Sequence, residues 1–170
     1  MEPTCRQANL DDIATVSSIL EEAASWLEGI GQVLWRPDEI SQDAVRDDVE
    51  DGLFYLFELS GEAVGTLKFQ LKDELFWPDI DPSESAFVHR VAIRRAHARS
   101  GLSSIMIRWA IAEALRHERR FLRLDCEASR PKLRAIYERF GFRHRDDRTV
   151  GPFHVSRYEI STVTTTEQDD

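Results

Sequence analysis

The chain has 170 residues, a formal net charge of −9, and 42% hydrophobic and 31% charged residues, which suit one soluble globular domain. The acidic balance argues against broad binding of nucleic acids or anionic membranes, because both need a basic surface. Two cysteines are too few for a disulfide framework, and the chain shows neither an apolar leader nor a membrane-length stretch, so we expect a cytoplasmic protein. A single domain is expected over 1–160, followed by a disordered tail at 161–170 that lacks core residues.

Hydrophobic periodicity and turn residues predict a succession of helices and strands. Asn9 or Asp11 can cap the first helix, Ser60-Gly61-Glu62 is a hairpin signal, and Gly141 is typical of a helix end. A strand, helix, strand succession in the second half implies a right-handed crossover between parallel strands. In order, we expect a strand at 2–7, a helix ending near Gly29, a helix at 37–51, strands at 53–59, 63–71 and 87–93, a helix at 105–117, a strand at 121–127, a helix at 131–141, and strands at 142–145 and 153–160.

Two loops are candidates for the acceptor side of a binding site. Trp26 and Trp35 flank a glycine-containing loop between the first two helices, where aromatic rings can form a substrate wall or close the core. Residues 72–85, KDELFWPDIDPSES, combine many acidic side chains with two prolines. Such a loop is either simply solvated or attracts a cationic amine. Both alternatives stay open for each loop.

The segment RRAHARSGLSS, between a strand and the next helix, is a candidate phosphate cradle. Gly101 permits close approach of the backbone, and the N–H groups from Arg99 to Ser104 lie at a helix start, where the dipole favours negative charge. Arg94, Arg95 and Arg99 add positive charge. The segment matches neither the P-loop nor the dinucleotide fingerprint, so its local pattern is also compatible with an ordinary helix start.

VHRVAIRRAHARSGLSSIMIRWA, followed by LRLDCEASRPKLRAIYERFGF, resembles the acetyl-CoA binding core of the GNAT superfamily of N-acetyltransferases over residues 86–145. The family's first motif, Q/R-x-x-G-x-G/A, corresponds to ARSGLS, with Gly101 at its centre and alanine and serine at its ends. The second motif, Y-E-R-x-G-F, is present as YERFGF from Tyr137. The resemblance implies an α/β fold (α+β in some schemes) with a mixed, largely antiparallel, V-shaped sheet, a central splayed pair of parallel strands, and helices on both faces.

The resemblance also implies the positions that bind the co-substrate, acetyl-CoA, and it implies no metal. Pantetheine would pair with the end of a strand near Val91 and Ile93, and the diphosphate would lie on residues 99–104. Many relatives carry asparagine where this chain has Arg130. The implied cofactor-binding residues are Val91, Ala92, Ile93, Arg95, Arg99, Ser100, Gly101, Leu102, Ser103, Ser104, Arg130 and Tyr137.

Acetyl transfer to an amine develops an oxyanion and expels a thiolate. Backbone N–H groups near Ala92 or Ile93 can stabilise the oxyanion without any particular side chain. The resemblance implies that Tyr137 protonates the leaving sulfur, and the alternative is a core aromatic stacked on Phe140 one helical turn away. Cys126 lies on an apolar strand and is expected to be a buried, inert thiol.

His89 is the candidate general base. Histidine changes charge near neutral pH, and strand alternation places His89 on one face with Phe87, Val91 and Ile93. The alternatives are a structural His89, hydrogen-bonded within the sheet, and a base that acts through a chain of waters. Asp125 and Glu127 lack ligand spacing with His89, so the sequence predicts no metal site.

The sequence therefore predicts an acetyl-CoA-dependent N-acetyltransferase that acts by direct attack in a ternary complex. Its partner would be an amine acceptor, either a small molecule or an N-terminal or lysine amine, with Trp26, Trp35 and the 72–85 loop on the acceptor side. The alternatives are a non-catalytic acyl-CoA binding or sensor domain and an unrelated α/β interaction module. Edge strands near the C-terminus can pair between subunits, so a homodimer is a further expectation.

Overall fold

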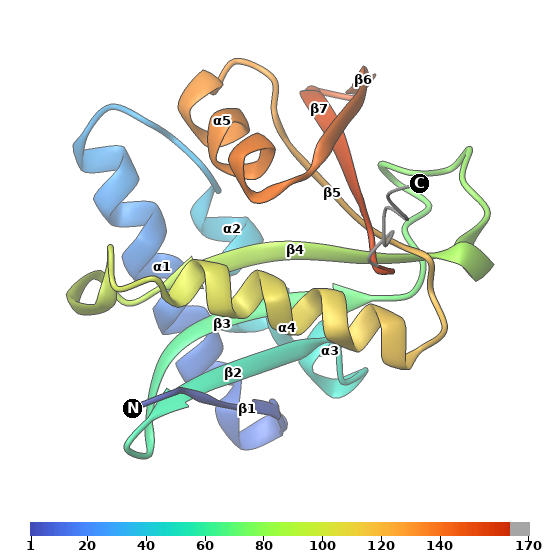
Figure 1. The fold of residues 1–170 in the computed structure, drawn as a ribbon. Coiled ribbons are helices and arrows are strands. Elements are labelled where there is room, and N and C mark those ends of the chain that lie inside the picture. Colours follow the sequence, from blue (N-terminus) through green and yellow to red (C-terminus); the bar gives the residue numbers. More distant parts are fainter. Residues whose placement is uncertain (164–170) are drawn as a thin grey trace. The chain divides into compact units, whose positions relative to one another are not determined.

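The computed structural model describes residues 1–163, whose seven strands form one mixed sheet (Figure 1). The strand order is β1-β2-β3-β4-β5-β7-β6; β4 and β5 pair in parallel, whereas β1–β2, β2–β3, β5–β7 and β6–β7 pair antiparallel. The mixed, largely antiparallel sheet predicted from the sequence is confirmed. The elements are β1 (Thr4–Gln7), η1 (Leu10–Asp12), α1 (Ile13–Gly29), α2 (Pro37–Ile40), α3 (Gln42–Glu50), β2 (Phe54–Leu59), β3 (Glu62–Gln70), η2 (Pro82–Glu84), β4 (Ser85–Ile93), η3 (Arg95–His97), α4 (Leu102–Arg116), β5 (Phe121–Glu127), α5 (Pro131–Phe140), β6 (Arg143–Val150) and β7 (Phe153–Ser161).

The chain folds into two compact units, each built from two segments of the sequence. Unit 1 consists of Met1–Phe69 and Arg90–Met106, and unit 2 consists of Gln70–His89 and the described residues from Ile107 onward. β4 and α4 therefore begin in one unit and end in the other. The single domain expected over 1–160 stays a prediction. Within the described chain, every helix is too short or too polar to cross a membrane.

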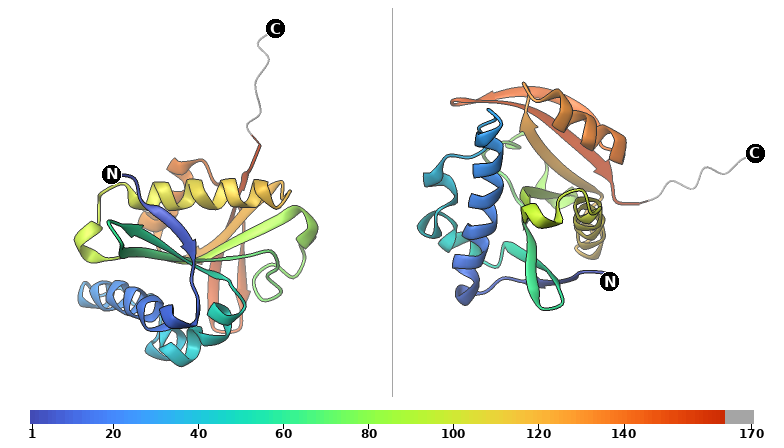
Figure 2. Two further views of the ribbon diagram at one scale, coloured as in Figure 1. Left: turned by 90° about the horizontal axis from the view of Figure 1, so that it is seen from below. Right: turned by 90° about the vertical axis from the view of Figure 1, so that its left-hand side faces the viewer.

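Unit 1 is organised around the apolar face of α1. Ile13, Val16, Ile19 and Leu20 recur at helical spacing, are buried, and belong to one core cluster with Leu56 of β2. α1, α2 and α3 lie on the same face of strands β1 to β3 (Figure 2). Burial of this apolar face against the strands explains why the first helix forms where its pattern predicts.

The region expected to be one helix from 37 to 51 is two helices. Ser41 has φ −62° and ψ 164°, an extended conformation that ends α2, and its hydroxyl accepts a hydrogen bond from the N–H of Ala44 (3.2 Å). Ser41 thus caps α3. The β2–β3 hairpin follows the prediction, because Ser60 (φ +52°) and Gly61 (φ +82°) both adopt the left-handed conformations of a two-residue turn.

In unit 2, β5 lies between β4 and β7. It pairs with β4 over Ser85–Phe87 and with β7 along its whole length. α5 begins at Pro131, as predicted, and is capped after Phe140 by Gly141, whose φ of +117° is rare for a residue with a side chain. The final strand pair is longer than expected, because β6 runs to Val150.

Two residues assigned to the tail by the sequence belong to ordered structure. Ser161 is the last residue of β7, and Thr162 is buried. The hydroxyl of Thr162 donates to the carbonyl of Arg119 (2.7 Å), and its N–H donates to the carbonyl of Arg120 (2.9 Å). The rest of the expected tail, from residue 164, lies outside the described residues.

A fully buried guanidinium joins three segments of unit 2. Arg157 of β7 pairs with Asp146 of β6 (2.6 Å) and with Asp79 (2.7 Å), and its Cζ lies 4.4 Å from the ring centroid of Trp77. Residues 72–84, hereafter the Trp77 loop, are therefore tied to the β6–β7 hairpin. Hydrogen bonding to Arg157 lowers the pKa of Asp79 to about 2, so the pair stays charged at neutral pH.

Arg157→Met should lower the free energy of unfolding by about 3 kcal/mol, because it leaves carboxylates without their counter-ion, the carbonyl of Phe76 without its donor, and a gap beside Trp77. Arg148→Met is the matched control. Arg148 pairs with the same Asp79 carboxylate (3.2 Å) but lies nearer the surface, so we expect a loss below about 1 kcal/mol. Urea unfolding followed by circular dichroism measures both, and equal losses would contradict this ranking.

Candidate active site

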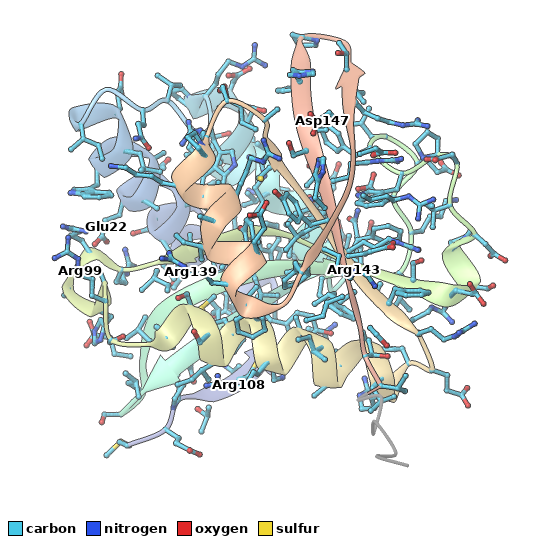
Figure 3. The ribbon with its side chains drawn as sticks, turned by 45° about the horizontal axis from the view of Figure 1, so that its top comes forward. Glu22, Arg99, Arg108, Arg139, Arg143 and Asp147 are labelled. Atoms are coloured by element: carbon cyan, nitrogen blue, oxygen red, sulfur yellow. The ribbon has the colours of Figure 1, made fainter. Side chains whose placement is uncertain are left out.

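The predicted phosphate cradle lies in unit 1, at the start of α4. β4 leads into the η3 turn, and the chain then adopts left-handed conformations at Arg99 (φ +63°) and Gly101 (φ +83°) before α4 begins. The N–H of Ile105 donates to the carbonyl of Gly101 (3.3 Å) and is the first helical donor, so the N–H groups of residues 102–104 have no acceptor within the helix. Arg99 is exposed on this loop (Figure 3). A helix start of this kind suits an anion.

Gly101 has open space where a side chain would project. A Cβ built on Gly101 would meet no atom within 4 Å, so the left-handed backbone, rather than crowding, favours glycine here. The hydroxyl of Ser100 donates to the carbonyl of His97 (2.6 Å), which stabilises the turn. The loop is thus held by its own hydrogen bonds and leaves room beside Gly101 for a ligand.

Two cradle arginines are anchored to α1. The guanidinium of Arg94 donates to Ser18 (2.8 Å) and Glu22 (2.8 Å), and the backbone N–H of Arg95 also donates to Glu22 (2.7 Å). The bond from Arg94 is the main reason that the pKa of Glu22 is lowered. The guanidinium of Arg95 lies 3.9 Å from the ring centroid of Trp26. Arg94 therefore fixes the cradle, whereas Arg95 lies on an aromatic ring.

The two tryptophans predicted on the acceptor side differ in their surroundings. Trp26 is 40% exposed and is stacked by Arg95. Trp35 is partly buried against the core of α1, with the Cζ of Arg90 5.2 Å from its ring centroid. Trp35 thus fits the alternative in which it closes the core, and an acceptor-binding role for either ring stays a prediction.

The strand segment expected to pair with pantetheine follows an irregular residue. Arg90 has φ +55°, a left-handed conformation that interrupts the regular pleat of β4. Alternation counted from His89 therefore does not extend to Val91 and Ile93, because it assumes an unbroken pleat. The two-residue alternation of side chains along a strand therefore cannot show that His89 shares a face of β4 with Val91 and Ile93.

Unit 2 brings His89 together with two carboxylates. Its Nε2 is 2.9 Å from Oδ2 of Asp73, and its Nδ1 is 3.7 Å from Oδ2 of Asp125. The side chains of His89, Asp73 and Asp125 are 16%, 4% and 8% exposed, and one nitrogen or oxygen atom from each lies within 4.8 Å of the others. These three residues, hereafter the Asp–His–Asp cluster, form a nearly buried group in which protons can be exchanged.

The Trp77 loop holds both carboxylates of the cluster. Oδ1 of Asp73 accepts from the backbone N–H groups of Leu75 (3.1 Å) and Phe76 (3.0 Å), and Nε1 of Trp77 donates to Oδ2 of Asp125 (3.3 Å). Burial raises the pKa of Asp125. Burial also acts on Asp73, but hydrogen bonds from the imidazole and the backbone outweigh it and lower the pKa of that carboxyl. A proton added to the carboxylates therefore favours Asp125.

Tyr137 of α5, the predicted acid, is sheltered among aromatic rings. Its centroid lies 5.9 Å from that of Phe142 and 6.3 Å from that of Tyr158. Burial raises the pKa of Tyr137, and nearby Cys126 and Asp125 raise it further, so the phenol stays protonated at neutral pH. Within the described part of the chain its hydroxyl makes no hydrogen bond, and its proton is therefore available to a ligand.

The hydrogen bonds of Arg130 and the burial of Cys126 are both explained by neighbouring residues. Nε of Arg130 donates to Glu127 (2.8 Å), which also accepts from Ser129 (2.9 Å). Glu127 thus bonds to Arg130 and Ser129, and a contact of Arg130 with the co-substrate stays a prediction. Burial raises the pKa of Cys126 to about 12, which supports the expectation of an inert thiol.

Asp73 and Trp77 are the site residues that sequence patterns do not identify. Both belong to a loop without periodicity, and the direction of a loop side chain depends on contacts with distant strands. In the structure Asp73 accepts from the N–H groups two and three residues later, as in an Asx-type turn, and the local signal in the sequence is only that aspartate favours such turns. That signal predicts a turn at Asp73 but not a partnership with His89.

Comparison with known proteins identifies the family. The model of the Acetyltransferase (GNAT) family matches residues 18–142. The uncharacterised N-acetyltransferase YesJ of Bacillus subtilis is 26% identical over 157 residues, which cover 89% of this chain and 87% of YesJ. A GNAT family acetyltransferase of Listeria monocytogenes is similar with a TM-score of 0.80, 24% identity and 94% of each chain covered. YncA of Salmonella typhimurium, solved with its cofactor acetyl-CoA, is similar with a TM-score of 0.70, 16% identity and 99% of each chain covered. The chain therefore belongs to the GNAT family of acetyltransferases.

Proposed function

We propose that this protein transfers the acetyl group of acetyl-CoA to an amine of a small molecule, an N-terminus or a lysine, by direct attack in a ternary complex. The acyltransferase class and the co-substrate follow from the family, and the acceptor and the direct attack are the proposal. The observation that carries it is the presence in unit 2 of a sheltered phenol, Tyr137, and of an imidazole, His89, bound to Asp73. One group can give a proton and the other can take one, as transfer to an ammonium requires.

The cradle is proposed to bind the co-substrate. The N–H groups of residues 102–104 and the charges of Arg95 and Arg99 suit its diphosphate, and the space beside Gly101 permits close approach. The backbone of residues 91–93 is proposed to pair with the pantetheine arm, as in the resemblance. A cytoplasmic location and a homodimer stay predictions.

Each chemical step has a proposed group in this chain. His89 takes a proton from the acceptor ammonium, and the neutral amine then attacks the thioester carbonyl. Backbone N–H groups near Ala92 or Ile93 are the proposed oxyanion donors. As the C–S bond breaks, the sulfur takes the proton of Tyr137, whose raised pKa keeps the phenol protonated until that moment. No metal takes part in this scheme.

Calorimetry with acetyl-CoA and with CoA, followed by thiol-release assays over a panel of amines, tests the proposed activity. The panel contains alkylamines, an aminoglycoside, and peptides with a free N-terminus or a free lysine. We expect both ligands to bind and at least one amine to release CoA with formation of its acetylated product, identified by mass spectrometry. Absence of binding would refute the proposal, and binding without turnover across the panel would favour an acyl-CoA sensor.

Gly101→Glu should abolish CoA binding, because it places bulk and negative charge in the open space beside the cradle. Gly61→Glu is the matched control. Gly61 has almost the same backbone (φ +82°, against +83° for Gly101) and also has open space around it, but it lies in the β2–β3 turn. Both variants therefore carry a similar backbone strain, which thermal unfolding checks. If calorimetry finds wild-type CoA affinity for Gly101→Glu, the diphosphate binds elsewhere on the protein.

Tyr137→Phe should lower kcat by about 100-fold, since it removes a general acid, and should leave CoA affinity within about twofold. Tyr158→Phe is the control. It also removes a hydroxyl from the aromatic group of unit 2, one that bonds to Glu138 (2.7 Å) and Arg134 (2.9 Å), but it leaves the proposed acid intact. If steady-state kinetics show equal turnover for Tyr137→Phe and wild type, Tyr137 is not the general acid.

A further inference from the structure

The Asp–His–Asp cluster contains one more carboxylate than an oriented histidine needs. We propose that Asp73, His89 and Asp125 act as one base, in which Asp73 is a positioning residue and Asp125 shares the proton that His89 removes from a cationic primary amine. This inference rests on the proposed acetyl transfer and names the protonation state in which the acceptor arrives.

Asp73 determines which ring nitrogen is available. Its Oδ1 is held by two backbone N–H groups of the Trp77 loop, and its Oδ2 lies 2.9 Å from Nε2 of His89. The lowered pKa of Asp73 keeps this carboxylate ionised, so it accepts a hydrogen bond from Nε2–H. Nδ1 is then the nitrogen that can gain or lose a proton.

Asp125 is the group that faces Nδ1. Its side chain is 8% exposed, and within residues 1–163 its carboxyl accepts a single hydrogen bond, from Nε1 of Trp77. A buried carboxylate with so few donors is poorly stabilised when charged, and its Oδ2 lies 3.7 Å from Nδ1 of His89. The two groups are therefore placed to share one proton, directly or through a water.

The charge of the cluster follows from this sharing. Asp73 is ionised, and one proton resides either on Nδ1 or on Asp125; both arrangements leave a single net negative charge. Two carboxylates this close to one another favour retention of that proton. A cluster with one net negative charge attracts an ammonium and becomes neutral when it takes a second proton.

The proposed proton transfer is balanced. An N–H bond of the acceptor ammonium breaks, its proton joins the pair formed by Nδ1 and Asp125, and the electron pair stays on the amine nitrogen. That nitrogen bonds to the thioester carbon, and the C–S bond then breaks with its electrons on sulfur. Sulfur takes the proton of Tyr137, the second amine proton restores the phenol, and the cluster returns its proton to solvent.

Several charged groups bear on this titration besides the cluster itself. Burial is the main cause of the raised pKa of Asp125, and Asp73 raises it further. The imidazole of His89, the hydrogen bond from Trp77 and the charge of Arg157 on β7 lower it. Asp125 in turn raises the pKa of Cys126 and of Tyr137. Arg157 and Asp125 are opposite one another in the β5–β7 register, so the positive charge stays near the cluster at every pH of interest.

The test compares kcat/KM against pH for wild type, Asp73→Asn and Asp125→Asn, with the best acceptor from the panel. Asp73→Asn removes the permanent negative charge beside the imidazole, so the acidic limb of the kcat/KM profile should move to lower pH by about one unit. Asp125→Asn leaves His89 as the only group of the pair that takes a proton, so the first proton already inactivates the cluster and the limb should move to higher pH. The plateau of kcat/KM should fall in both variants because the cluster is incomplete. Asp81→Asn, in the same loop but exposed, is the control and should leave the limb in place. If the acidic limb of the profile stays in place in both Asp73→Asn and Asp125→Asn, the two carboxylates are structural and the proposal is overturned.

Double substitution tests whether the cluster acts as one unit. If His89→Gln costs about 100-fold and Asp125→Asn about 10-fold, independent roles predict a loss of about 1,000-fold in the double variant. A shared base predicts a loss close to that of His89→Gln alone. Multiplicative losses would therefore contradict the proposal, as would loss of turnover in EDTA with recovery on zinc, which would indicate a metal site.

Nuclear magnetic resonance of the free protein separates this proposal from the proposed activity, because it needs no turnover. The chain has five histidines, and His89→Gln assigns the imidazole signals of His89. We expect ¹⁵N shifts that show a protonated Nε2 in wild type, and a titration midpoint that falls in Asp125→Asn. A midpoint unchanged by Asp125→Asn would refute proton sharing even if the enzyme acetylates amines, and a shifted midpoint without turnover would refute the proposed activity alone.

Discussion

The buried ion pairs of Arg157 hold the Trp77 loop of unit 2 against β6 and β7. A guanidinium without solvent contact is tolerable only where carboxylates and carbonyls surround it, and here Asp79, Asp146 and the carbonyl of Phe76 supply them. Two of these acceptors belong to the Trp77 loop, so the loop has one favourable position against β7. Trp77 then lies under Arg157 and donates to Asp125. The arrangement of the proposed base thus depends on a charge that does not itself react.

Local chemistry explains most of what the sequence could predict about the fold. Helical spacing placed α1, a turn signal placed the β2–β3 hairpin, and proline and glycine placed the ends of α5, because each of these depends on neighbours along the chain. The single helix expected at 37–51 is wrong, because the spacing of apolar residues continues through Ser41, where the serine caps a new helix. The left-handed Arg90 gave no signal, because arginine has no preference for that conformation.

The candidate site was only partly predictable, and for a different reason. Family motifs pointed to the cradle and to Tyr137, and residue type pointed to His89, all of which lie in or beside regular elements. Asp73 lies 16 residues before its partner in a loop whose course is determined by long-range ion pairs. Arg157 lies in a strand where a charged residue normally indicates a solvated face, yet it is fully buried. Ion pairs between buried residues that lie far apart in the sequence produce no local sequence pattern from which they could be predicted.

The distribution of tryptophans has an optical consequence. Two of the four, Trp26 and Trp35, belong to unit 1, and the other two, Trp77 and Trp109, belong to unit 2. Trp26 is 40% exposed beneath the cradle arginine Arg95, whereas Trp77 is 1% exposed and surrounded by charged and aromatic groups. Trp26 therefore contributes a water-exposed component to the intrinsic fluorescence at the cradle and Trp77 a shielded component at the proposed base, beside the emission of the partly buried Trp35 and Trp109. The emission spectrum carries built-in reporters for each half of the proposed chemistry, without any added label.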